Sequence, residues 1–128
     1  MATLDDVARL ALELPEAVEE DARGTRRWKV KDKLFVWERP LRRSDLEALG
    51  DAAPKGVVLG ARVEHEVAKR ALLADPSGVF FTTPHFDGYP AILVRLDAIG
   101  LDDLREVIVE AWLLRAPKRT VKAYLAES

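Results

Sequence analysis

The sequence of 128 residues contains no cysteine, which excludes disulfide bonds and thiolate metal sites. It has only two histidines, His65 and His85, so a structural zinc site has few candidate ligands. No apolar run approaches the roughly 20 residues that a membrane-spanning helix needs. The first residues are acidic where a signal peptide would be basic. We therefore expect a cytoplasmic protein that does not enter a membrane.

Repeats, low-complexity tracts and linkers are also absent from the sequence. A chain of this length falls in the usual size range of one domain, and it can bury enough surface to fold without disulfide bonds. We therefore expect residues 1–128 to form a single domain.

The formal net charge of −2 conceals an uneven distribution along the chain. Residues 1–22 carry seven acids and one base, whereas residues 23–43 carry nine bases and two acids. A second, smaller excess of bases lies in residues 111–128. Such basic segments form either a solvated surface or a set of contacts to an acidic partner.

Hydrophobic periodicity predicts an α+β domain in which an antiparallel sheet carries helices packed on one face. Thr3 and Asp6 resemble a capping box at the start of the first helix, and Ser44 resembles the cap of a short helical turn. The expected helices are 4–14, 44–49, 64–74, 100–116 and 117–126, with Val67 facing inward in the third. The expected strands are 17–22, a hairpin over 26–39, 57–61, 79–83 and 91–96.

The hairpin over residues 26–39 carries alternating bases and large apolar residues. A two-residue loop at Asp32 and Lys33 would pair residue 30 with 35 and residue 28 with 37. That pairing places Trp28 and Trp37 on one buried face and the bases on the opposite face. We also expect Trp112 to be buried, because it belongs to the apolar stripe of its helix.

The stretch FTTPHFDGYP, residues 81–90, joins two expected strands. Asp87-Gly88 is typical of a hairpin turn, because both residues tolerate positive φ. The same stretch is also a candidate ligand loop held by rigid strands. A third alternative is a metal or hydrolytic site, which would need a further acid beside His85 and Asp87. The candidate ligand-loop residues are Thr83, His85, Asp87 and Tyr89.

The segments VFFTTPHFDGYPAILVRLDAI and DLREVIVEAWLLRAPKR resemble the MmcQ/YjbR family of small bacterial proteins. The resemblance continues upstream through VKDKLFVWER and LELPEAVEE, so it covers nearly the whole chain. The loop departs from the family pattern, since the better-known branch carries His-x-Asn-Lys followed by Trp. Only His85 of that motif is present here, so a role of the asparagine and lysine does not carry over.

The resemblance implies a frataxin-like (CyaY-like) α+β fold, described as a double-wing arrangement, and DNA binding. Phosphate contacts would come from basic side chains, and residues 23–43 and 115–122 would then form one basic surface. An isoelectric point near 5.7 is unusual for a DNA binder. The candidate DNA-binding residues are Arg26, Arg27, Lys29, Lys31, Lys33, Lys118, Arg119 and Lys122.

The alternative function is a non-enzymatic module that binds a protein or a small ligand, with an apolar pocket near Trp37, His85 and Tyr89. The sequence contains no phosphate-cradling glycine loop and no catalytic constellation. We therefore expect no enzymatic activity, no cofactor and no resident metal. We expect a monomer or a weak dimer.

Overall fold

The computed structural model describes residues 2–127 and has the expected α+β architecture. Within these residues one antiparallel sheet is combined with five α-helices and three short 3₁₀ segments. The helices are α1 (Leu4–Leu12), α2 (Arg43–Leu49), α3 (Glu66–Leu73), α4 (Leu101–Arg115) and α5 (Lys118–Glu127). The 3₁₀ segments are η1 (Gly50–Ala52), η2 (Pro84–Phe86) and η3 (Leu96–Ala98).

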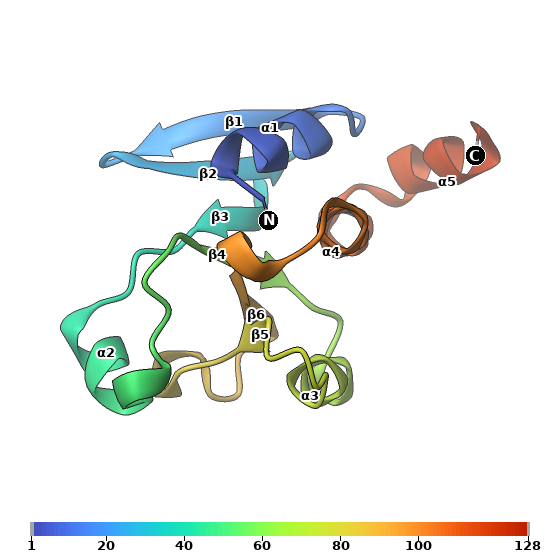
Figure 1. Cartoon of the computed structure of the whole chain (residues 1–128). Helices are drawn as coiled ribbons and strands as arrows, with labels where there is room; N and C mark the ends of the chain where they lie inside the picture. Colours follow the sequence, from blue (N-terminus) through green and yellow to red (C-terminus); the bar gives the residue numbers. More distant parts are fainter. Residues whose placement is uncertain (1, 128) are drawn as a thin grey trace.

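The six strands form a single twisted sheet in the order β1-β2-β3-β4-β6-β5 (Figure 1). Every neighbouring pair is antiparallel. The acidic segment at residues 17–22, weakly predicted as an edge strand, is confirmed as one. The strands are β1 (Ala17–Ala22), β2 (Thr25–Val30), β3 (Lys33–Glu38), β4 (Val58–Arg62), β5 (Phe80–Phe81) and β6 (Ala91–Arg95).

The main core lies between one face of the sheet and helices α1, α3 and α4. Trp28 and Trp112 are both fully buried in it, which confirms their predicted burial. The indole N–H of Trp112 donates a hydrogen bond to the Pro15 carbonyl oxygen at 3.1 Å. This bond and the apolar contacts fix α4 against the end of the first helix.

A smaller second core lies on the opposite face of the sheet, because β4 and β6 alternate their side chains between the two faces. It contains Phe81, Phe86 and Leu93 among its buried residues, with Trp37 and Leu49 packed against it. Helix α2 and the segment 82–90 cover this face. The prediction of helices on one face therefore holds for α1, α3 and α4 but not for α2.

The β2–β3 turn lies one residue earlier than predicted, so the predicted hairpin register is wrong. Lys31 and Asp32 are the turn residues, with φ values of 49° and 65°, and Val30 pairs with Lys33. A bulge at Trp28 and Lys29 then pairs Trp28 with Val36. The irregularity leaves Trp28, Phe35 and Val36 in the main core, while Trp37 packs against the second core.

Two helical details also differ from the predictions. Arg42 rather than Ser44 is the N-cap residue of α2. Val67, predicted to face inward, is 70% exposed, and Lys69 is buried instead. Among residues 2–127 we find no helix with the length and apolar character that crossing a membrane requires.

Candidate functional site

The loop over residues 82–90 leaves the edge strand β5 and returns into β6. Its 3₁₀ segment η2 ends in a tight turn, closed by a 3.0 Å hydrogen bond from the Tyr89 N–H to the Phe86 carbonyl. Asp87 has φ −60° and only Gly88 has a positive φ, of 75°. Asp87 and Gly88 therefore form a turn between two antiparallel strands, as predicted, but it has type II geometry, in which only Gly88 uses the positive φ that both residues tolerate.

Lys69 fastens this loop to helix α3. Its side chain is 2% exposed, and its ammonium group donates hydrogen bonds to the carbonyl oxygens of Phe86 at 2.7 Å and Tyr89 at 3.0 Å. The sequence reasoning missed this residue, because a lysine in a helix is normally expected on the solvated face. No local pattern links it to carbonyls 17 and 20 residues away.

A buried ion pair between Arg39 and Asp45 also contacts the loop, at the Phe86 ring. The Arg39 guanidinium donates to Asp45 Oδ2 at 3.0 Å and lies 5.2 Å from the centre of the Phe86 ring. Burial raises the pKa of Asp45, but the backbone N–H of Arg42 and the charge of Arg39 outweigh this and hold the pKa below its ordinary value. The carboxylate therefore stays ionised at neutral pH.

Thr83 lies in this buried region and not on the surface of the loop. It is 2% exposed, and its hydroxyl makes no hydrogen bond of ordinary geometry within residues 2–127, although it lies close enough to Asp45 to contribute to the lowered pKa. Of the four candidate ligand-loop residues, Thr83 is therefore the one that lies in the interior.

The other three candidate loop residues, His85, Asp87 and Tyr89, line an open cleft of about 580 Å³. Other lining residues come from β2, β3 and the segment that follows them, and they include Trp37. Sequence reasoning had named His85, Tyr89 and Trp37 as the residues of a possible pocket, and the fold brings them together. The remaining lining residues are Thr25, Arg27, Leu34, Glu38, Arg39, Arg42, Phe86 and Gly88.

Trp37 reaches its position in the cleft because its partner across the sheet is a glycine. Gly60 pairs with Trp37 in the β3–β4 ladder. A Cβ atom at Gly60 would stand 2.3 Å from Cε2 of the indole and 2.4 Å from its Nε1. The ring therefore lies directly over the Gly60 backbone, where no larger residue leaves it room.

The cleft combines aromatic surface with positive charge. Arg42 is exposed and has no carboxylate within ion-pair distance among residues 2–127. Arg27 also faces the cleft, but its guanidinium lies 3.7 Å from Glu20. Two acids, Glu38 and Asp87, share the lining. The Glu38 carboxylate accepts a 3.0 Å hydrogen bond from the Arg26 N–H, so it is already engaged.

Arg26, the first candidate DNA contact, is held on the helix side of the sheet. Its guanidinium donates to Glu19 at 2.9 Å and to Asp5 at 3.0 Å, and it lies over the Trp28 ring. The hydrogen bonds to Glu19 and then to Asp5 raise the pKa of Arg26. The reciprocal bond to Arg26 lowers the pKa of Glu19.

The other paired hairpin bases meet acids of strand β1 or of the residue just before it. Lys29 lies 3.3 Å from Glu20, the acid that Arg27 also approaches. Lys31 in the turn lies 2.8 Å from Glu16. Glu16 in turn accepts a 2.5 Å hydrogen bond from the Thr120 hydroxyl on α5. The two basic segments therefore approach each other at one corner, with an acid between them.

The remaining four candidate DNA contacts are exposed and have no ion pair within residues 2–127. Lys33 follows the β2–β3 turn, and the other three lie in the first half of α5. Among the candidate DNA contacts, the unpaired charge thus lies at this corner and not on strand β2, where Arg26, Arg27 and Lys29 all have acidic partners. These four residues are Lys33, Lys118, Arg119 and Lys122.

A family profile named YjbR matches residues 12–114 of the sequence. The chain belongs to the YjbR family. It is 55% identical over 131 residues to the uncharacterised proteins Rv2570 of Mycobacterium tuberculosis and Mb2600 of Mycobacterium bovis, and the alignments cover 100% of this chain and 99% of each relative.

A solved structure shares the fold of this YjbR-family chain. The crystal structure of Deinococcus radiodurans protein DR2400, a DUF419 domain, has a TM-score of 0.68 and 22% sequence identity. The superposition covers 99% of this chain and 88% of that one. The YjbR match and this neighbour support the predicted α+β single domain.

The metal alternative for this YjbR-family protein has no cluster of ligands in the part of the chain that the structure describes. No three histidine or acidic side chains gather there closely enough to hold an ion. His85 packs edge-on against the Phe86 ring at 4.8 Å, and His65 caps α3 by accepting from the Ala68 N–H. Both histidines therefore have structural contacts of their own.

Proposed function

We propose that this YjbR-family protein is a binding module whose cleft takes a small organic anion carrying a flat ring. The observation that supports the proposal is the convergence of Trp37, His85 and Tyr89 on one cleft that also holds the unpaired Arg42. Its volume of about 580 Å³ lies within the usual range of small-ligand pockets.

The chemistry of the lining determines the class of ligand. Trp37 and Tyr89 both offer aromatic surface in the lining, and a flat ring gains most from such contacts. A guanidinium recognises carboxylate or phosphate oxygens through paired hydrogen bonds. Arg42 is the cleft cation that no carboxylate among residues 2–127 neutralises, so it is the expected anion contact.

The cleft is also held in shape without a ligand. Lys69 fixes the carbonyls of Phe86 and Tyr89, and Arg39 supports the Phe86 ring. A site that is already ordered loses less conformational entropy when a ligand binds. These buried supports therefore favour a binding role for the loop over a purely connecting one.

Intrinsic fluorescence provides a direct test, because Trp28 and Trp112 are fully buried while Trp37 lines the cleft. Titration with adenosine monophosphate and benzoate should change the emission of Trp37, and calorimetry should confirm the affinity and test indole-3-acetate, whose own indole fluoresces. Trp37→Phe should remove the fluorescence change. If none of the probes binds by either method, the small-anion proposal fails.

Two neighbouring arginines supply a matched pair of variants. Arg42→Ala should weaken binding by about tenfold to a hundredfold, the usual effect of a hydrogen bond to a charged group. Arg43→Ala should leave the affinity unchanged, because that side chain is 94% exposed, pairs with Glu47 and lies outside the cleft. Equal effects of both variants would contradict a specific role of Arg42.

DNA binding is a second proposal, supported by the four unpaired bases where the β2–β3 turn approaches α5. Because strand β1 neutralises much of the hairpin, we expect fewer phosphate contacts than the count of bases indicates. Four contacts give a slope of about −3.6 for log affinity against log salt, at about −0.9 per contact. Affinity should then be weak and independent of sequence.

Fluorescence anisotropy with a labelled duplex at several salt concentrations tests this second proposal. Lys118→Ala with Lys122→Ala should flatten the slope by about two units. Lys29→Ala should change it little, because that ammonium already pairs with Glu20. Absence of binding at low salt would exclude DNA as the partner.

The finer parts of the family resemblance also belong to this proposal. They are the frataxin-like (CyaY-like), double-wing description of the fold, a cytoplasmic location and an oligomeric state of monomer or weak dimer. Structural superposition on a frataxin would test the first of these. Fractionation of cells that express the protein would test the second.

A further inference from the structure

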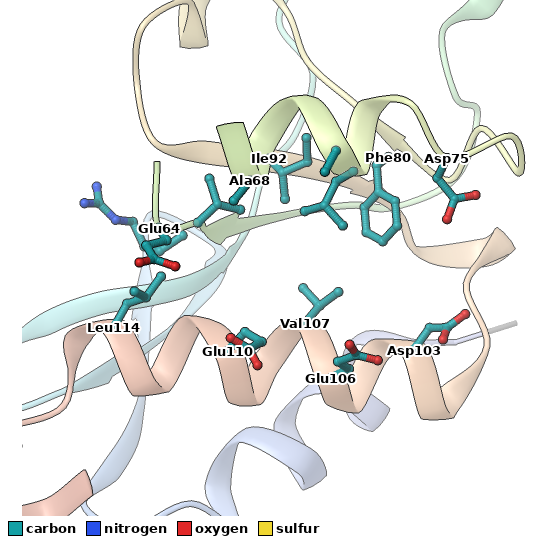
Figure 2. A pocket seen from close by; sticks show the side chains of 14 residues that line it. Glu64, Ala68, Asp75, Phe80, Ile92, Asp103, Glu106, Val107, Glu110 and Leu114 are labelled. Atoms are coloured by element: carbon teal, nitrogen blue, oxygen red, sulfur yellow. The ribbon is translucent and has the colours of Figure 1, made fainter. Parts of the chain in front are cut away.

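A second concavity, a groove of about 390 Å³, separates α3 from α4. Figure 2 shows Phe80, Ile92 and Val107 between the two helices, with Ala68 on α3 beside them. The floor of the groove is therefore apolar. Within residues 2–127 the groove shares no lining residue with the cleft beside His85.

The rim of this groove is strongly acidic. Asp103, Glu106 and Glu110 line its α4 side, and Glu64 and Asp75 also border it (Figure 2). None of the three α4 acids has an ion-pair partner among residues 2–127. Arg62 is the one basic residue in the lining, and its guanidinium lies over the Tyr89 ring.

Helix α5 carries exposed positive charges, opposite in sign to the acidic rim of the groove. It extends from the end of α4 away from the body of the molecule (Figure 1), and none of its residues 118–127 is buried. Val121 and Tyr124 attach it to the main core, where the Tyr124 ring lies against Trp112. Lys118, Arg119 and Lys122 are exposed, and Lys118 and Lys122, four residues apart, lie on the same side of the helix.

We propose that this acidic groove binds helix α5 of a second copy of the chain in a reciprocal homodimer. Glu106 and Glu110 are four residues apart on α4, and Lys118 and Lys122 are four residues apart on α5. Four residues rise about 6 Å along a helix, so two helices laid side by side can pair both acids with both lysines.

The apolar floor of the groove also suits helix α5 of the second copy. A lysine side chain can lay its methylene stem along apolar surface while its ammonium group reaches acidic groups at the edge. The groove between α3 and α4 offers such a floor with such an edge. Because each copy supplies one helix and one groove, a two-fold axis satisfies both contacts and closes the assembly.

This proposal is independent of the ligand proposed for the cleft, and it competes with DNA for the lysines of α5. Sedimentation velocity over a range from about 5 to about 500 µM measures the dimer directly. We expect association at about 50 mM salt and its loss at about 500 mM, since exposed ion pairs are screened. A protein that stays monomeric across this range at low salt would overturn the proposal.

Charge exchange gives the decisive experiment. Glu106→Lys with Glu110→Lys in one chain, and Lys118→Glu with Lys122→Glu in another, should each weaken self-association by on the order of tenfold or more. An equimolar mixture of the two variants should recover the dimer, because both groove contacts then join opposite charges. Failure of the mixture to associate would overturn the inference.

A control separates this surface from a general effect of charge. Glu47→Lys reverses an exposed acid on α2 that lies outside the groove. It should leave the dimer unchanged, and thermal melting should show that all the variants fold. If either charge-reversed double variant dimerises as well as the original chain, the contact lies elsewhere and the proposal is wrong.

Discussion

Lys69 offers the sharpest test of how this fold holds its cleft. Lys69→Met keeps the length and apolar character of the side chain but removes the ammonium group. The Phe86 and Tyr89 carbonyls then lose their charged donor in a buried site. A hydrogen bond to a charged group contributes about 1.5–3 kcal/mol, so two contribute about 3–6 kcal/mol.

The measured loss should be smaller than this sum, because the variant no longer buries a charge. Methionine avoids the cost of desolvating a buried ammonium group, which offsets part of the lost hydrogen bonding. We therefore expect a net loss of about 2–4 kcal/mol in the free energy of unfolding. Urea denaturation measures that loss. Acrylamide quenching of Trp37 reports the loop separately, since opening the loop exposes the indole in the cleft.

Arg70→Ala is the matched control in the same helix. Arg70 is exposed and, among residues 2–127, pairs only with Glu66 at 3.8 Å, so its removal should cost less than about 0.5 kcal/mol. If Lys69→Met costs no more than this control and leaves Trp37 quenching unchanged, the two buried hydrogen bonds do not hold the loop.

Three further predictions concern the supports of the fold. Gly60→Ala should cost about 1–3 kcal/mol and shift the emission of Trp37, because the new Cβ displaces the indole; unchanged emission would contradict this. Trp112→Ala should cost about 3–5 kcal/mol in urea denaturation, and a loss below about 1 kcal/mol would place the ring outside the core. Asp45 has a lowered pKa in the fold, so its ionised carboxylate stabilises the folded state. This stabilisation is fully present above the unfolded pKa near 3.9 and declines as pH falls through the folded pKa. Asp45→Asn should therefore be less stable than the original chain at pH 7, with a gap that narrows below about pH 4 in acid titrations; a gap independent of pH would refute this.

The sequence predicts the elements of this fold well where local chemistry determines them. The Thr3 and Asp6 capping box is present as predicted, and α4 begins and ends within a residue of expectation. Both depend on residues within a few positions of each other. Trp28 and Trp112 are buried because a small domain with few large aromatic residues places them in its core.

The hairpin register was missed for a physical reason. A turn at Lys31 and Asp32 differs from one at Asp32 and Lys33 by a single residue, and aspartate tolerates the left-handed conformation in either turn. The bulge at Trp28 then changes which residues face each other. A bulge depends on packing against other strands and helices, so the hairpin sequence alone does not predict it.

The uneven charge distribution along the sequence has two possible structural interpretations. Residues 1–22 and 23–43 carry opposite charges, a pattern that fits either a solvated surface or contacts to an acidic partner. In the fold Glu20 lies opposite Arg27, and Asp21 lies opposite Arg26, across the β1–β2 ladder. Opposite charges on neighbouring strands stabilise the pairing.

The bases of strand β2 are therefore paired with acids of the neighbouring strand β1. A nucleic-acid footprint needs charges that no protein acid has neutralised. By that criterion strand β2 contributes little, whereas Arg42 in the cleft, Lys33 beside the turn and the bases of helix α5 have no ion pair among residues 2–127. The cleft, the corner and the acidic groove are consequently the surfaces where a binding function of this protein should be sought.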